Sequence, residues 1–222
     1  MIFDVSIGVS PRTPIWPGGQ RPAFTVTHQP LPGGNETVAT RLDMIAHSGT
    51  HIDAPLHFRR NGQTIDAVEL GKLMGPCRVF EHRGPGHIGR AELDEMGFSP
   101  VRRALFRTAN SARLHTGVLG ADYISFLDEA IDVLIHSGVE VLGIDGFSIG
   151  PYGEMSDTNH VAFCGAGGLI IEMLDLTSVA PGDYLLVALP LKLEGVEAAP
   201  SRVLLMREED LDGVFGKQGE NG

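Results

Sequence analysis

The stretch HSGTHIDAPLHF, residues 47–58, sets the constraint that the rest of the fold must satisfy. Within twelve residues it contains three histidines and an aspartate, namely His47, His51, Asp53 and His57. All four positions are odd, so an extended backbone would project the four side chains to one side. A helix would also bring the first two histidines together, but Gly49, Pro55 and the β-branched residues between them disfavour a helix.

A straight strand does not suffice either. At roughly 3.3 Å per residue, the Cα atoms of His47 and Asp53 would lie about 20 Å apart, too far to share an ion. The segment must therefore bend, and we expect the bends at Gly49 and Pro55. The resulting strand-to-loop corner would gather imidazoles and a carboxylate around a metal. The alternative is a chance cluster of partly exposed histidines, since the chain has nine.

Composition restricts the class of protein. The 222 residues can form one large domain or two small ones with a sizeable core. A hydrophobic content of 42% and a mean hydropathy near zero are typical of a water-soluble globular protein. With 17 basic and 28 acidic residues the net charge is −11. Such an acidic chain disfavours non-specific binding to nucleic acid or to an anionic membrane, and suits a small substrate.

The cysteines and the apolar runs indicate a cytoplasmic protein. Two cysteines, Cys77 and Cys164, are too few for a disulfide scaffold and fit a reducing compartment. The N-terminal MIFDVSIG has no basic region and does not resemble a signal peptide. The apolar run GGLIIEML is interrupted by Glu172 and is shorter than the ~18 residues of a spanning helix. We therefore expect no membrane partner.

Periodicity predicts more strands than helices. Strands are expected over 2–8, 23–29, 37–46, 75–82, 102–108, 139–145, 167–174, 181–191 and 201–207. A short helix is expected over 88–97, and the segment 61–70 is expected to begin as a turn and to continue as a short helix. The strongest helix pattern covers 125–138, with Ser125 as N-cap and Gly138 at the C-terminal end. The fold class is therefore α/β, with mixed sheets around a β-barrel-like core. We expect a single domain over 1–210 and a flexible tail over 211–222.

Two distant residues are candidates to complete the site. Glu172 is a carboxylate inside an apolar strand, where burial is costly unless the group is paired or binds a metal. The alternative is an edge position facing solvent. His160 closes a polar loop predicted over 146–160, a length that is often functional. Histidine and carboxylate ligands suit Zn²⁺ or Mn²⁺, and carboxylates can bridge two ions. Cys164 lies near His160, but a buried, inert cysteine is the favoured interpretation.

Trp16 is the remaining candidate. It lies on SPRTPIWPGG, a loop rich in proline and glycine, where a tryptophan more often forms a surface wall or ligand contact than core. The other histidines, His28, His82, His87, His115 and His136, lack partners at useful spacing and are assigned no chemistry. The sequence has no nucleophile-elbow, P-loop or dinucleotide-binding motif.

The motif at 47–58 resembles the H-x-G-T/A-H-x-D-x-P-x-H signature of the bacterial cyclase family of metal-dependent hydrolases, which includes kynurenine formamidases and isatin hydrolases. TPIWPGG, GPCRVF, GVEVLGID and GDYLLVALPLKLEGVEAAPSRVLL resemble further family segments in the same order. The resemblance extends over about residues 3–207. It implies a compact α/β domain around a barrel-like core, assembled as a homodimer or homotetramer.

The resemblance also implies roles for the candidate residues. His47, His51 and Asp53 match ligands of a first metal ion, and His160 and Glu172 match ligands of a second, with both carboxylates bridging. His57 matches the catalytic acid/base, and Trp16 a pocket aromatic. The implied reaction is hydrolysis of an aryl formamide such as N-formylkynurenine by metal-activated hydroxide.

One departure bears on the substrate. No Ser-Lys pair precedes His160, whereas the formamidase pattern has one. Two alternatives therefore stay open beside the formamidase. One is an isatin hydrolase-like opening of a cyclic amide. The other is a non-catalytic metal-binding protein, which His57 disfavours because a scaffold needs no free acid/base.

Overall fold

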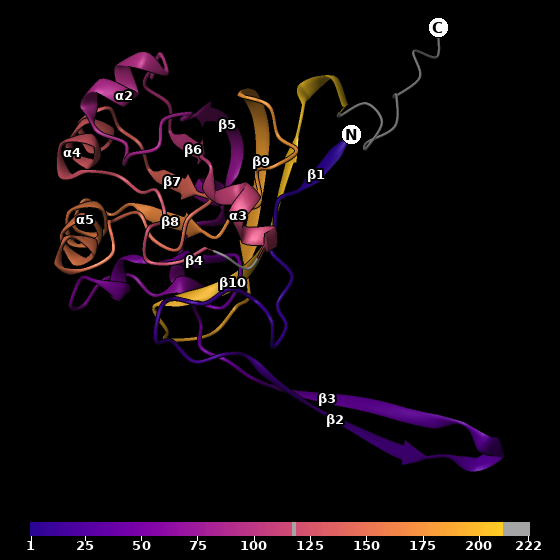
Figure 1. Ribbon diagram of the computed structural model, residues 1–222. Helices are drawn as coiled ribbons and strands as arrows, with labels where there is room; N and C mark the ends of the chain where they lie inside the picture. Colours follow the sequence, from indigo (N-terminus) through magenta and orange to yellow (C-terminus); the bar gives the residue numbers. More distant parts are fainter. Residues whose placement is uncertain (117–118, 211–222) are drawn as a thin grey trace, which may run out of the picture.

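Seven strands close into a barrel in this computed structural model, which describes residues 1–116 and 119–210 (Figure 1). The predicted tail at 211–222 lies outside the described residues. The strand order is β10-β4-β8-β7-β6-β5-β9, and β9 pairs back with β10 to complete the ring. The strands are β4 (His51–Asp53), β5 (Met74–Glu81), β6 (Arg103–Arg107), β7 (Val141–Ile144), β8 (Leu169–Glu172), β9 (Gly182–Pro190) and β10 (Ala198–Met206), with β1 (Ile2–Asp4) added outside β10.

The sheet is mixed, as predicted. Strands β5, β6, β7 and β8 are parallel, while β4, β9 and β10 join them by antiparallel pairing. Parallel neighbours need crossover connections, and helices supply them. These are α2 (Arg90–Glu95), α3 (Asn110–Thr116), α4 (Asp128–His136) and α5 (Glu154–Gly165), while α1 (Leu70–Leu73) precedes β5. Helices α2, α4 and α5 form one layer against the sheet (Figure 1).

The core has two parts because strand side chains alternate between faces. Leu105 points into the barrel with Val79, Ile171 and Val203, and its neighbour Phe106 points to the helix layer. The barrel interior is filled: a Cβ added at Gly143 would lie 2.3 Å from Leu105 Cδ2. The predicted barrel-like core is therefore confirmed, and its centre is a packed interior rather than a ligand cavity.

Several local predictions were wrong, and one helix was missed. The short helix predicted within 61–70 is only a 3-10 turn, η3 (Ile65–Ala67), and α1 begins at Leu70. The helix predicted from 125 begins at Asp128, because the backbone N–H groups of Phe126 and Leu127 bond to neighbouring loops instead of starting a helix. Ser125 is buried and its hydroxyl contacts His87 Nδ1 at 3.0 Å. Helix α3 was not predicted. The loop predicted over 146–160 is helical from Glu154 as part of α5.

A two-stranded arm leaves the barrel and extends into solvent (Figure 1). It consists of β2 (Ala23–Pro30) and β3 (Glu36–Asp43), joined by a turn that includes η1 (Pro32–Gly34). Every residue of both strands is exposed, and the two strands pair only with each other. Within the part of the chain that the structure describes, no helix has the length and apolarity needed to cross a membrane.

Candidate metal centre

The motif at 47–58 folds as a turn, a short strand and a 3-10 turn. Gly49 has φ +64°, and a Cβ there would lie 2.8 Å from Val9 Cγ2, so only glycine fits both the conformation and the space. Strand β4 covers His51–Asp53, and η2 (Pro55–His57) then turns the chain back. The predicted bends are therefore confirmed. The side chains of His51 and Asp53 point to the same side because they alternate along the strand, whereas His47 and His57 reach the site through turns.

Strand pairing brings Glu172 to the motif. In the antiparallel pair of β4 and β8, Glu172 lies opposite His51. The Thr50 hydroxyl donates to the Met173 carbonyl at 2.5 Å, which fixes the end of this pair. Glu172 is only 4% exposed, so the alternative of a solvent-facing edge position is wrong.

Helix α5 delivers His160 to the same place. His160 Nε2 lies 3.1 Å from Glu172 Oε1, which also accepts the Ile149 N–H at 2.9 Å. The ring of Phe58 stacks on the His160 ring at a centroid distance of 4.6 Å. The described buried positions 159, 160, 163 and 164 of this segment follow a helical period. That spacing was the available signal for a helix, and the glycines and polar residues before it obscured the pattern.

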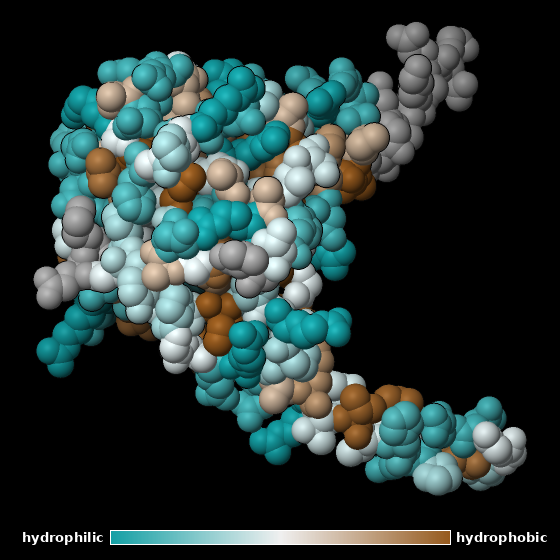
Figure 2. Space-filling model, in the orientation of Figure 1, coloured by the Kyte–Doolittle hydropathy of each residue, from teal (hydrophilic) through white to brown (hydrophobic). Residues whose placement is uncertain are grey.

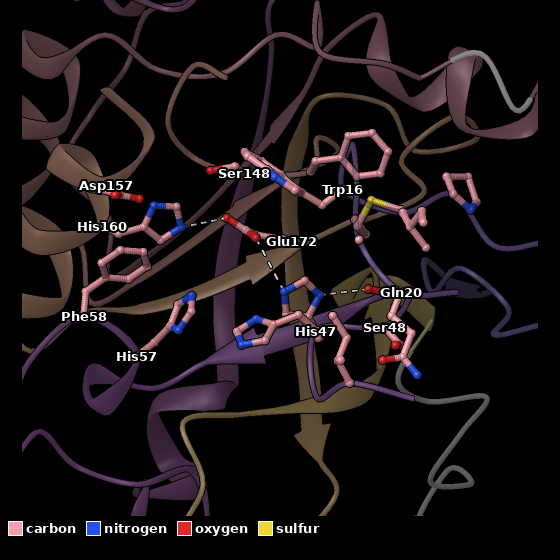
Figure 3. Close-up of a pocket in the computed structure, with 18 residues that line it drawn as sticks. Trp16, Gln20, His47, Ser48, His57, Phe58, Ser148, Asp157, His160 and Glu172 are labelled. Carbon is pink, nitrogen blue, oxygen red and sulfur yellow. Dashed lines mark hydrogen bonds and ion pairs between the residues drawn. The ribbon is translucent and has the colours of Figure 1, made fainter. Parts of the chain in front are cut away.

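Two groups of possible ligand atoms form and share one carboxylate. His47, His51 and Asp53 make the first group, and Asp53, His160 and Glu172 the second; within each group the ligand atoms lie within 4.8 Å of one another. Figure 3 shows the imidazoles arranged around Glu172. Asp53 Oδ1 lies 3.0 Å from His47 Nδ1 and 3.4 Å from His51 Nε2, and its Oδ2 lies 4.0 Å from His160 Nε2.

The donor set fits divalent cations. Among the described residues, His51 Nε2 and both oxygens of Asp53 are buried and have no hydrogen-bond partner. His51 Nδ1 lies 2.8 Å from the Gly49 carbonyl, so it holds the ring proton and donates it, which leaves a lone pair on Nε2. Buried lone pairs of this kind are costly when nothing binds them. Nitrogen and oxygen donors without thiolates match Zn²⁺ or Mn²⁺.

Electrostatics keep the carboxylates ionised. Burial alone would raise the pKa of Asp53, but the imidazoles of His51 and His47 outweigh burial and lower that pKa. Burial likewise opposes ionisation of Glu172, but the nearby imidazoles of His160 and His51 lower its pKa. Both groups are therefore anionic at neutral pH, as ligands must be.

The pKa values of His47 and His57 are shifted in opposite directions. Burial would lower the pKa of His47, but its 3.0 Å contact with Asp53 and the charges of Asp53, Glu172 and Glu197 raise that pKa to about 9. For His57, burial is the largest effect and its pKa is lowered from 6.5 despite the nearby Asp53. His57 Nε2 lies 3.9 Å from Asp53 Oδ2, and His57 belongs to neither ligand group.

A cavity of about 360 Å³ opens over these residues. Trp16, 36% exposed, lines it, with its ring 5.2 Å from the Tyr152 ring and 5.9 Å from the Tyr123 ring. The sequence interpretation missed several lining residues, including Gln20, Ser48, Phe58, Ser148 and Asp157 (Figure 3). Ser48 and Phe58 belong to the motif at 47–58 and could have been included. Gln20 directly follows the Trp16 loop, and Ser148 and Asp157 lie in the segment 146–160.

Comparisons with known proteins identify the family of the chain. The Cyclase family model, described as "Putative cyclase", matches residues 3–151. A kynurenine formamidase of Salinibacter ruber is 34% identical over 215 residues, covering 94% of this chain and 99% of that protein.

Solved structures share the whole fold. One described as "predicted metal-dependent hydrolase from Bacillus stearothermophilus" has a TM-score of 0.78 and 32% identity, covering 92% of this chain and 97% of that one. Isatin hydrolase A from Labrenzia aggregata has a TM-score of 0.76 over 93% of each chain; at 24% identity this likeness concerns the fold. On its sequence and its barrel, the chain belongs to the cyclase family.

Proposed function

We propose that this protein is a metal-dependent amidohydrolase that acts on a C–N bond other than a peptide bond. The proposal rests on the two groups of possible metal ligands, which share Asp53 and lie beneath a cavity with aromatic walls. In this proposal His47, His51 and Asp53 hold one divalent ion, and Asp53, His160 and Glu172 hold a second. When bound, the ions lower the pKa of a water ligand to roughly 7 and polarise the scissile carbonyl.

His57 is the proposed acid/base. It lines the cavity but lies outside both ligand groups, so a ring nitrogen stays available for proton transfer. Burial lowers its pKa below 6.5, so the imidazole is neutral at pH 7 and can accept a proton from the attacking water. The resulting imidazolium can pass that proton to the leaving nitrogen. The contacts of its ring with the rings of His47 and Phe58, both at 4.3 Å, hold it over the site.

The proposed substrate is a small aryl formamide such as N-formylkynurenine. The Salinibacter ruber relative, a kynurenine formamidase, supports this reaction class. Trp16 and Phe58 give the cavity aromatic walls, which suit an aniline leaving group. Because no Ser-Lys pair precedes His160, opening of a cyclic amide such as isatin is the second candidate. A non-catalytic metal-binding protein is disfavoured by the free His57.

An activity panel tests the proposal. Protein reconstituted with Zn²⁺ or Mn²⁺ is assayed on N-formylkynurenine, simple formanilides and isatin. Turnover of the formanilides with loss on chelation supports the formamidase, and turnover of isatin alone supports the second candidate. No turnover of any of them by fully loaded protein contradicts the amidohydrolase proposal. Elemental analysis of the purified protein distinguishes zinc from manganese.

We also propose cytoplasmic location and a homodimer. Both cysteines are free and buried, which fits a reducing compartment. For assembly, the arm is the supporting feature. Its register places Phe24 opposite Leu42 and His28 opposite Val38, so Phe24, Val26, Val38 and Leu42 share one exposed apolar face. An isolated two-stranded ribbon is marginally stable in water and needs a surface to pack against.

A second copy is the occupant that fits this face. The arm stands away from its own barrel, and brown patches mark its apolar side chains (Figure 2). The barrel exposes Leu189, Leu191 and Leu193 at the end of β9. Reciprocal packing of each arm on the other copy forms a closed twofold interface. Eight residues per strand make one arm face about 26 Å by 10 Å, and two arms with their receiving surfaces bury about 1,000 Å², the lower bound for a stable interface.

Light scattering tests this assembly. The wild type is expected at twice the monomer mass, and V26E/V38E is expected to be monomeric while keeping its barrel by circular dichroism. The control T25E/T27E alters the opposite arm face and is expected to stay dimeric. A monomeric wild type, or a dimeric V26E/V38E, contradicts the arm-mediated dimer. A mass four times that of the monomer indicates the homotetramer.

A further inference from the structure

Behind His47, on the side away from the shared carboxylate, lies Glu197. His47 Nδ1 is 3.0 Å from Asp53 Oδ1, and His47 Nε2 is 3.2 Å from Glu197 Oε1. The imidazole therefore lies between two carboxylates, and only Asp53 belongs to a ligand group. If Nδ1 faces an ion, Nε2 must hold the ring proton and donate it to Glu197.

The barrel fixes this contact through the main chain. Strand β10 begins at Ala198, which lies opposite Asp53 in the antiparallel pair with β4. The Ala54 N–H donates to the Glu197 carbonyl at 2.8 Å, so the backbone of Glu197 is held beside the motif. A substitution of the Glu197 side chain leaves this backbone bond in place. The carboxylate can therefore be removed without losing the strand pairing.

His51, the second histidine of the first ligand group, is oriented in the same way by a different acceptor. His51 Nδ1–H donates to the Gly49 carbonyl at 2.8 Å, which leaves Nε2 to face the carboxylates. Both imidazoles thus have their outer nitrogen engaged. A carbonyl fixes the His51 ring, and a carboxylate fixes the His47 ring. A carboxylate acceptor orients a ligand imidazole and also increases its electron donation to a metal.

We propose that Glu197 is a positioning residue for the metal centre. By accepting the Nε2–H of His47 it selects the tautomer with a free Nδ1, holds the ring in the ligand direction and tightens binding at the first ligand group. This inference rests on the proposed metal site, and its test measures metal binding rather than turnover.

The test compares E197A, E197Q and the control E194Q in Zn²⁺ competition against a chromophoric chelator. Glu194 is an exposed carboxylate in the same β9–β10 loop and contacts neither ligand group. We expect E197A to bind the ion of the first ligand group about 10- to 100-fold less tightly. E197Q keeps an acceptor oxygen and should recover part of that loss, and E194Q should match the wild type. In ¹⁵N-histidine spectra of the zinc-loaded wild type, His47 should show the Nε2–H tautomer.

Three results would overturn the proposal. Wild-type zinc affinity in E197A would show that the contact does not support the site. A loss of zinc affinity in E197Q as large as that in E197A would contradict the role of Glu197 as a hydrogen-bond acceptor. A Nδ1–H tautomer of His47 together with loss of a whole ion in E197A would make Glu197 a ligand. None of these depends on substrate, so absence of hydrolysis in the activity panel does not affect the outcome.

Discussion

Asp53 is the residue whose replacement distinguishes a shared two-ion centre from two separate sites. Among the described residues Asp53 alone belongs to both ligand groups, with one oxygen toward His47 and His51 and the other toward His160, whereas Glu172 belongs to the second group only. The conservative change D53N keeps the shape and removes the charge and one acceptor. We expect D53N to lose both ions, whereas H47A and E172A each interrupt one group and keep one ion.

The expected change in melting temperature follows from the linkage between metal binding and folding. An ion that binds only the folded state at about 100 times its dissociation constant contributes about 2.7 kcal/mol. In a domain of 150–250 residues each kcal/mol raises the melting temperature by about 2–4 °C, so one ion should raise it by about 5–11 °C. The wild type should show about twice the shift of H47A or E172A. D53N should show none.

Elemental analysis after dialysis, paired with melting curves with and without chelator, measures both quantities. D132N is the matched control, because Asp132 is exposed on helix α4 and belongs to neither ligand group, and it should match the wild type. Curves in chelator separate loss of binding from loss of folding. A D53N protein that retains one ion per chain would refute the shared carboxylate, and so would an H47A protein that loses both.

The same geometry makes four further predictions. H57A should keep both ions and its melting temperature but lose about 10²- to 10⁴-fold in kcat, and equal activity would contradict the acid/base role. Because the pKa of His47 is raised to about 9, zinc affinity should rise about tenfold per pH unit up to about pH 9. The stability that the His47 proton gives the metal-free protein is full below pH 6.5 and should be lost by about pH 9. W16A should raise KM for formanilides more than it lowers kcat. An unchanged KM would contradict the contact of Trp16 with the substrate.

Local chemistry accounts for the part of the site that the sequence predicted. Glycine and proline constrain their own backbone, so the bends at Gly49 and Pro55 follow from residue type. The cost of burying a carboxylate singles out Glu172 in the same way, because its apolar neighbours along the strand cannot offset that cost. The barrel followed from the number of strands and the resemblance. For the bends and for Glu172 the evidence lies within a few residues of the position concerned.

Predictions failed where distant contacts decide the local structure. The segment before His160 contains glycines and polar residues that favour a loop, yet from Glu154 it is a helix packed on the sheet by Phe163 and Cys164. Ser125 has the chemistry of an N-cap, but its backbone is held in a bridge between Ile88 and Phe126. Propensity is a weak guide when tertiary pairing supplies the hydrogen bonds. Glu197 had no sequence signal, because its role depends on the register of β10.

The register of the strands in the closed barrel brings the residues of the site together. Strand β4 has three residues, and it is held on both sides, by β8 opposite His51 and by β10 opposite Asp53. A slip of β8 by one residue would replace Glu172 with an apolar neighbour and turn the carboxylate to the other face. The second ligand group would then lose a member, and His160 would lose its 3.1 Å contact. Ring closure fixes both neighbours of β4 at once, so ligands more than 100 residues apart in sequence meet in one register.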